Sequence, residues 1–234
     1  MARKSFQQEL EELKEQVLKM GTQVESAIAW AVKSLADKDP NLARKVIDED
    51  DLVDEMQHVI EDRCLSMLAL QQPMAGDLRT IGTALKIVTD LERIGDHAVD
   101  IARVTIALEG QPLIKPLIDI PRMAFLAQRM IHEVLTAYVK RDVAMAYSLK
   151  PLETEVDDLY QQVFRELLLI MMANPSTIRQ ATHLLFVAMY LERVADHATN
   201  VAEWVIYLVC GKRGDIDADD PNDKFGDVDK SIEP

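Results

Sequence analysis

Apolar residues recur three and four positions apart along most of the chain, which is the pattern of amphipathic α-helices. Strict alternation of apolar and polar residues, which would indicate strands, is missing from the sequence. Proline and glycine divide the helical pattern into six segments. We place these segments at residues 3–36, at 42–70, from the turn QQPMAGD to about 109, at 122–140, up to 173 with a possible break at Pro151, and from NPST to about 211.

The last three segments repeat the first three. The phrase DLERIGDHAVDIA begins at Asp90, and YLERVADHATNVA begins one hundred residues later, at Tyr190. Upstream, the stretch that begins at Asp37 aligns with the one that begins at Lys140, at an offset of 103. Each single helix must bury its apolar stripe against others. The sequence therefore predicts an all-α fold of two tandem, pseudo-symmetric, antiparallel three-helix bundles.

Composition shifts along the chain suggest four parts. We expect a first three-helix bundle at 1–110 and a second at 122–212. The stretch GQPLIKPLIDIP holds three prolines, so residues 111–121 are predicted to be a linker. Residues 213–234 form an acidic tail that is predicted to be disordered, because eight of the last twenty residues are Asp or Glu.

Four pairs of carboxylates with i,i+4 spacing occupy corresponding places in the two halves. At 100° per residue, Glu92 and Asp96 lie at the border of the apolar stripe of their helix, whereas Arg93 and His97 point further out. Asp100 follows this pair, and its counterpart is an asparagine. The candidate residues are Asp50, Asp54, Glu92, Asp96 and Asp100 in the first half, and Glu153, Asp157, Glu192, Asp196 and Asn200 in the second.

Like charges four residues apart destabilise a helix by about 0.2–0.5 kcal/mol per pair, and burial adds to that cost. One such pair is typical of a solvated surface, but four at matching positions favour a bound cation. Ligands made only of oxygen select hard ions such as Mg²⁺, Mn²⁺, Ca²⁺ or Fe³⁺, and carboxylates also hold zinc. We interpret these pairs as metal ligands. His97 and His197 are expected to be surface or capping residues.

Charge and composition exclude several classes of protein. The formal net charge is −14, which argues against binding to nucleic acid. Cys64 and Cys210 stand apart, so neither a disulfide framework nor a thiolate zinc site is predicted. The first residues lack the apolar region of a secretory signal. Uncharged runs reach only about a dozen residues, and a membrane span needs about 20, so no direct membrane insertion is expected.

At its two LER-x-x-DHA phrases the sequence resembles the PhoU family of phosphate-specific transport system accessory proteins, over about residues 5–212. The resemblance implies two symmetry-related three-helix bundles whose acidic motifs bind multinuclear clusters of iron or zinc; magnesium and manganese remain possible metals. Asn200 stands where the first half has a carboxylate, so the second site carries less charge. No phosphate-binding residues are assigned.

The resemblance also implies a function. Such proteins are negative regulators of phosphate uptake and of the phosphate-starvation response. They link the ATPase subunit of the phosphate ABC transporter to a sensor histidine kinase. We therefore expect a cytoplasmic protein, peripheral to the inner face of the membrane through its partners, and a homodimer is plausible because the repeats have long apolar faces.

Two other classes remain open at this point. A carboxylate-bridged di-iron or multi-iron enzyme would use a Glu-x-x-His motif, and Glu55 to His58 has that spacing, but such bundles need a second copy. The chain shows no Ser-His-Asp order and no glycine-rich phosphate loop, so we do not predict an enzyme. A metal-free helical module, whose acids bind a basic partner surface, would show little bound metal.

Overall fold

The computed structural model describes residues 2–214 and 216, and it describes side chains from Phe6 onward. These residues form eight α-helices and one 3₁₀-helix, with no strand among them. The α-helices are α1 (Ala2–Asp37), α2 (Pro40–Asp48), α3 (Asp50–Gln71), α4 (Ala75–Ala107), α5 (Asp119–Lys140), α6 (Val143–Tyr147), α7 (Lys150–Ala173) and α8 (Ile178–Cys210); the 3₁₀-helix η1 is Pro175–Thr177. Most of the predicted disordered tail lies outside the described residues.

The all-helical prediction is confirmed, and the six predicted segments are all present. Two of them are divided into a short and a long helix. The second segment breaks at Glu49, between α2 and α3, and the fifth breaks at Ser148 and Leu149, between α6 and α7. Pro151 lies in the first turn of α7, where the missing N–H breaks no hydrogen bond.

The local structure at the two divided segments repeats as the sequence does. Lys38 and Arg141, which are 103 residues apart, both adopt a left-handed conformation, with φ of 56° and 53°. The next residues, Asp39 and Asp142, both cap the following short helix. The Asp39 carboxylate accepts hydrogen bonds from the amides of Asn41 and Leu42, so it satisfies amide groups that the first turn leaves unpaired.

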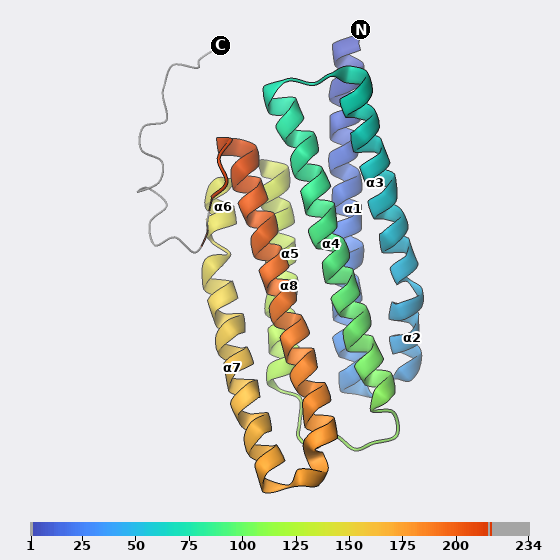
Figure 1. Ribbon diagram of the computed structural model, residues 1–234, viewed down its shortest axis with the longest axis vertical. Coiled ribbons are helices and arrows are strands. Elements are labelled where there is room, and N and C mark those ends of the chain that lie inside the picture. The colour runs from blue at the N-terminus through green and yellow to red at the C-terminus, as the bar shows by residue number, and fades with distance from the viewer. Residues whose placement is uncertain (1, 215, 217–234) are drawn as a thin grey trace.

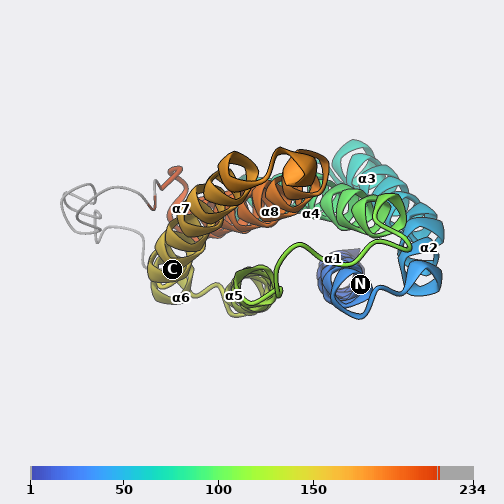
Figure 2. The same cartoon turned by 90° about the horizontal axis from the view of Figure 1, so that it is seen from below.

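The helices form two layers (Figure 2). One layer contains α3, α4, α8 and α7 in that order across the molecule, and the other contains α1 and α5. Helices α4 and α8 run in opposite directions and pack along much of their length (Figure 1). This pairing, together with the packing of α1 against α5, joins the first repeat (α1–α4) to the second repeat (α5–α8). The two LER-x-x-DHA phrases therefore lie on adjacent helices at the centre of the protein.

One hydrophobic core runs through both repeats. Leu13 and Val17 of α1, Leu91 of α4, and Leu191 of α8 are all fully buried. Burying a side chain of this size contributes about 1.5–3 kcal/mol. The acid-bearing helices α4 and α8 are therefore fixed by a large common core, and the positions of their polar side chains are set by it.

The connection from α4 to α5 is held against the second repeat. The amide of Ile114 donates to Oε1 of Gln180 at 2.5 Å, and Nε2 of Gln180 donates to the carbonyl of Pro112 at 3.0 Å. Lys115 pairs with Glu166 of α7. In the part of the chain that the structure describes, no helix is both long enough and apolar enough to cross a membrane.

Candidate functional site

The two predicted acidic pairs of the first repeat come from the start of α3 and the middle of α4. Gly95 allows these helices to approach closely, because a Cβ atom there would lie 3.3 Å from Oδ1 of Asp50. The pKa of Asp50 is raised to about 6, first by burial and then by the negative charges of Asp54, Asp96 and Glu92. The structure therefore brings both predicted pairs of this repeat within electrostatic range of each other.

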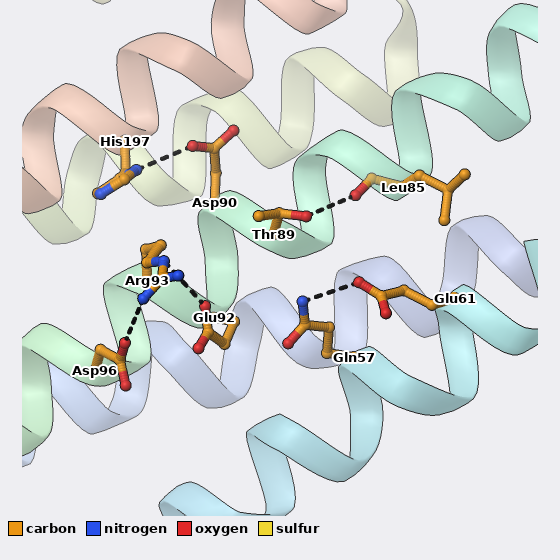
Figure 3. A network of polar contacts seen from close by, with 9 residues as sticks. All are labelled: Gln57, Glu61, Leu85, Thr89, Asp90, Glu92, Arg93, Asp96 and His197. Atoms are coloured by element: carbon orange, nitrogen blue, oxygen red, sulfur yellow. Dashed lines mark hydrogen bonds and ion pairs between the residues drawn. The ribbon is translucent and has the colours of Figure 1, made fainter.

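The pKa of Glu92 is raised as well. Burial raises the pKa of Glu92, and the neighbouring Asp96 adds to the effect. Arg93 offsets part of it, since its Nε lies 3.5 Å from Oε2 of Glu92 and its Nη1 lies 3.2 Å from Oδ2 of Asp96 (Figure 3). The Arg93 side chain is 58% exposed, so water screens these ion pairs. The carboxylates keep a net negative charge at the border of the core.

The second repeat has a similar arrangement. Burial raises the pKa of Glu192, followed by the charges of Asp196 and Asp157. Glu153 is buried near the start of α7, where Nζ of Lys150 lies 3.0 Å from its Oε2. Asp50 is the counterpart of Glu153 in the first repeat. Among the described residues no lysine forms an ion pair with Asp50, so the two repeats differ at this position.

A hollow of about 580 Å³ between α4 and α8 brings the two repeats together. Four residues of each phrase line it, together with Arg103, which follows the first phrase: Arg93, Asp96, His97, Asp100, Arg103, Arg193, Asp196, His197 and Asn200. Nη1 of Arg103 lies 3.2 Å from Oδ1 of Asp100. Asp100 and Asn200 thus line this shared hollow together with Asp96 and Asp196, the second acids of the pairs on α4 and α8.

The prediction that His97 lies at the surface is wrong. His97 is only 9% exposed, and its ring stacks on Tyr190 of α8, with the ring centroids 5.6 Å apart. Burial lowers the pKa of His97 to about 4, and the charge of His197 adds to the effect. A helical-wheel projection of α4 alone, at 100° per residue, places His97 away from the apolar stripe. In the structure α8 packs against that side of α4 and buries it.

His197 is partly buried in the same interface. Its Nδ1 lies 2.9 Å from Oδ1 of Asp90 (Figure 3). Its ring centroid lies 5.8 Å from that of His97. The sequence interpretation missed Asp90 and Tyr190, although both begin the repeated phrase. The repeated phrase alone did not reveal these contacts, because they form only where the antiparallel helices α4 and α8 pack against each other.

The negative charge of the carboxylates suits a bound cation, but in the described part of the chain their side chains are not arranged around a common metal position. Among residues 2–214 and 216, no three His, Cys, Asp or Glu side chains are placed so that they could hold a metal ion. Asp50 nevertheless carries a penalty for ionisation that the nearby Arg103 only partly offsets. A cation between the pairs would remove that penalty. Metal binding at the ten predicted positions stays a prediction.

Taken together, the fold and the acidic pairs define an all-helical protein built from two copies of one unit, with the repeated phrase at the junction. A model of the PhoU domain matches the chain twice, over residues 17–105 and 120–205. The chain belongs to the PhoU family.

Curated relatives match almost the whole chain. A phosphate-specific transport system accessory protein PhoU homolog from Clostridium acetobutylicum is 44% identical over 217 residues, which is 92% of this chain and 99% of the relative. A homolog of the same description from Rhizobium meliloti is 37% identical over 96% of both chains. The family resemblance predicted from the two phrases is confirmed.

Solved structures support the fold independently. The crystal structure of PhoU from Pseudomonas aeruginosa superposes with a TM-score of 0.85 at 38% identity, and the match covers 88% of this chain and 100% of the other. The phosphate transport system regulatory protein PhoU from Streptococcus pneumoniae superposes with a TM-score of 0.83 at 30% identity, over 90% of this chain and 99% of the other.

Proposed function

We propose that this protein is a metal-binding regulatory adaptor that restrains phosphate uptake and phosphate-starvation signalling. In this role it links the ATPase subunit of the phosphate ABC transporter to a sensor histidine kinase, at the inner face of the membrane. The names of the relatives, which describe accessory proteins of phosphate transport, support the transport half of this proposal. The protein acts by binding and not by turnover, and its working form is a homodimer.

The observation that carries the metal-binding part is the close approach of α3 to α4 at Gly95, which places Asp50 near Asp54, Glu92 and Asp96; burial, and after it these neighbouring charges, raise the pKa of Asp50. The first repeat would hold metal with its two pairs and Asp100. The second repeat would use Glu153, Asp157, Glu192 and Asp196, with Asn200 as a neutral oxygen donor. The ions would be iron or zinc in multinuclear clusters, with magnesium or manganese as alternatives. Bound metal supplies positive charge that joins α3 to α4 and α7 to α8.

Elemental analysis tests metal binding. We expect protein purified without chelator to contain iron or zinc, and we expect Glu92→Gln with Asp96→Asn to lower that content while the fold persists. Glu11→Gln with Glu15→Gln is the matched control, because these acids have the same i,i+4 spacing on the exposed face of α1. Equal metal content in all three proteins would contradict the assignment.

Binding to purified partners tests the adaptor role. The protein is immobilised, and the ATPase subunit and the cytoplasmic part of the sensor kinase are passed over it separately and together. We expect each partner to bind and both to bind at once. Reproducible absence of binding by both partners would overturn the adaptor proposal. Sedimentation equilibrium of the unmodified protein tests the homodimer, and a monomer at all concentrations would exclude it.

A further inference from the structure

An apolar groove lies between α1 and α3, on the edge of the molecule away from the junction of the repeats. Its volume is about 380 Å³. Leu52 and Val59 line it from α3 and are 50% and 49% exposed, although both are large apolar residues. They are seven residues apart, so they lie on the same face of α3, two turns from each other. Gln16 and Lys19 line it from α1.

The second repeat allows a comparison, because its helices α5 and α7 correspond to α1 and α3. The offset of 103 extends to α1 and α5, because buried residues of α1 match buried residues of α5: Val17, Met20, Val24 and Ile28 correspond to Ile120, Met123, Ala127 and Ile131. At this offset Lys19 and Leu52 correspond to Arg122 and Glu155. Nη2 of Arg122 lies 2.6 Å from Oε1 of Glu155, so an ion pair joins α5 to α7 there.

A second polar contact lies two turns further along. Gln16 and Val59 correspond to Asp119 and Gln162, and Nε2 of Gln162 donates to Oδ1 of Asp119 at 3.5 Å. At these two positions polar side chains bridge the helices of the second repeat, whereas exposed apolar side chains border the groove in the first.

In the first repeat the polar bridge lies one turn beyond Val59, where Arg63 donates to Gln16 and Glu12 of α1. Leu52 and Val59 are therefore not needed to build the fold. Single exposed apolar residues are common, but two that face one groove indicate a binding surface.

The charges beside the groove indicate what binds. Asp51, Glu55 and Asp62 are exposed on the solvent side of α3, and Glu55 lines the groove itself. Within the described residues none of these three carboxylates forms an ion pair or a hydrogen bond through its side chain. Basic groups placed above α3 would therefore meet carboxylates that no protein group yet neutralises.

We propose that this groove docks a basic amphipathic helix of a partner protein. The apolar face of the helix covers Leu52 and Val59, and its lysine or arginine side chains meet the three carboxylates of α3. The inference rests on the proposed adaptor function, because it assigns that adaptor a docking surface. The chain's own last twenty residues are strongly acidic and would be repelled from α3.

The experiment uses the full chain and a labelled amphipathic peptide of leucine and lysine, with binding followed by fluorescence anisotropy. In the test variant, Leu52→Glu and Val59→Gln each introduce the residue that stands at the corresponding position of the second repeat. The control is Leu169→Ser, an exposed leucine whose counterpart is Ser66. We expect affinity to fall at least about tenfold in the test variant and to stay unchanged in the control.

The variant separates docking from general attraction to an acidic protein. Leu52→Glu adds a negative charge, so unspecific attraction of the peptide would grow stronger, whereas docking in the groove grows weaker. Equal or tighter binding by the test variant would overturn the proposal, and so would equal binding of a peptide of leucine and glutamate. A change in oligomeric state of the test variant would assign the groove to a contact between copies and would also overturn it.

A second variant guards against a failure of folding. Asp51→Asn, Glu55→Gln and Asp62→Asn keep the apolar groove and remove its charge, and we expect weaker binding with a reduced dependence on salt. An unchanged salt dependence would contradict the proposal. If the parent binds the peptide but captures neither ATPase nor kinase, the adaptor function fails and the docking surface stands. If the parent protein and the test variant capture these partners equally well, the docking proposal is overturned and the adaptor function stands.

Discussion

His197 of the second repeat lies against Asp90 of the first, with 2.9 Å between Nδ1 and Oδ1. The corresponding pair, His97 and Tyr190, forms a ring stack at the matching place. Each LER-x-x-DHA phrase therefore has two tasks. Its glutamate lies near the acids of the neighbouring helix in its own repeat, and its histidine contacts the residue that precedes the other phrase. This explains why the chain carries the phrase twice, on two helices that run in opposite directions.

The His197–Asp90 contact predicts a loss of stability when it is removed. Asp90→Ala leaves His197 partly buried without its partner, and we expect the free energy of unfolding to fall by about 1–3 kcal/mol. Urea denaturation measures this change. Thr89→Ala on the exposed face of the same turn is the control and should change stability by no more than about 0.5 kcal/mol. An Asp90→Ala protein as stable as the control would show that the contact contributes nothing.

Two glycines of α4 predict opposite results. Apart from its chain neighbours and the backbone of α4, no atom of the described residues lies within 4 Å of the place where a Cβ of Gly82 would stand. Gly82→Ala should therefore raise the free energy of unfolding by about 0.5–1 kcal/mol. At Gly95 the Cβ would already meet Asp50 and Val53 at 3.3 Å. The larger Gly95→Val should lower the free energy of unfolding by about 1–3 kcal/mol. Thermal denaturation of both variants checks the pair; stabilisation by valine at 95 would contradict the close approach of α3 and α4.

The raised pKa of Asp50 predicts a pH dependence in metal-free protein. The folded state binds this proton more tightly than the unfolded state, because the pKa is about 6 when folded and 3.8 for the model group. The contribution of Asp50 therefore favours the folded state most at low pH, declines as pH rises from about 4 to 6, and remains unfavourable above that.

Asp50→Asn isolates this contribution. At pH 7 in the presence of a chelator, we expect the variant to be more stable than the parent by about 1 kcal/mol, a value reduced because the group is partly exposed to water. The gain should shrink as pH falls toward 4. Urea denaturation at several pH values measures the difference, and a gain that is constant with pH would contradict the origin assigned to it.

The two cysteines should differ in reactivity. Cys64 is fully buried, and burial raises the pKa of its thiol to about 12, whereas Cys210 is exposed at the end of α8. Because the thiolate is the reactive species, we expect an aromatic disulfide reagent to modify one thiol of the native protein and both after unfolding. Rapid modification of Cys64 in the native protein would show that α3 opens from the core.

Much of the fold follows from local sequence signals. The break at DKDPN was predicted from proline and its polar neighbours, and Asp39 caps the helix that begins there. The duplication predicted that α4 and α8 are equivalent. The break between α2 and α3 was not predicted, because the apolar spacing continues across it without a change of period. The break in the fifth segment was expected at Pro151 and lies just before it, at Ser148 and Leu149.

The candidate site could be predicted only in part from the sequence. The wheel placed Glu92 and Asp96 at the border of the apolar stripe, and their partial burial agrees with it. It misplaced His97, since one helix gives no sign of which neighbour covers its polar side. Arg193 and Tyr190 were missed for the same reason: they acquire a role only where α4 and α8 cross. Long-range packing sets these contacts, and a periodic pattern records only the face of a single helix.

The central claim is that the acidic pairs of both repeats hold metal, and anomalous scattering at the iron and zinc edges of a crystal grown without chelator tests it most directly. We predict anomalous peaks beside Asp50 and Glu92 in the first repeat and beside Glu192 in the second. The same experiment on Glu92→Gln with Asp96→Asn should lose the first group of peaks and keep the second. Crystals of the parent protein with no anomalous peak near any of these carboxylates would contradict the account.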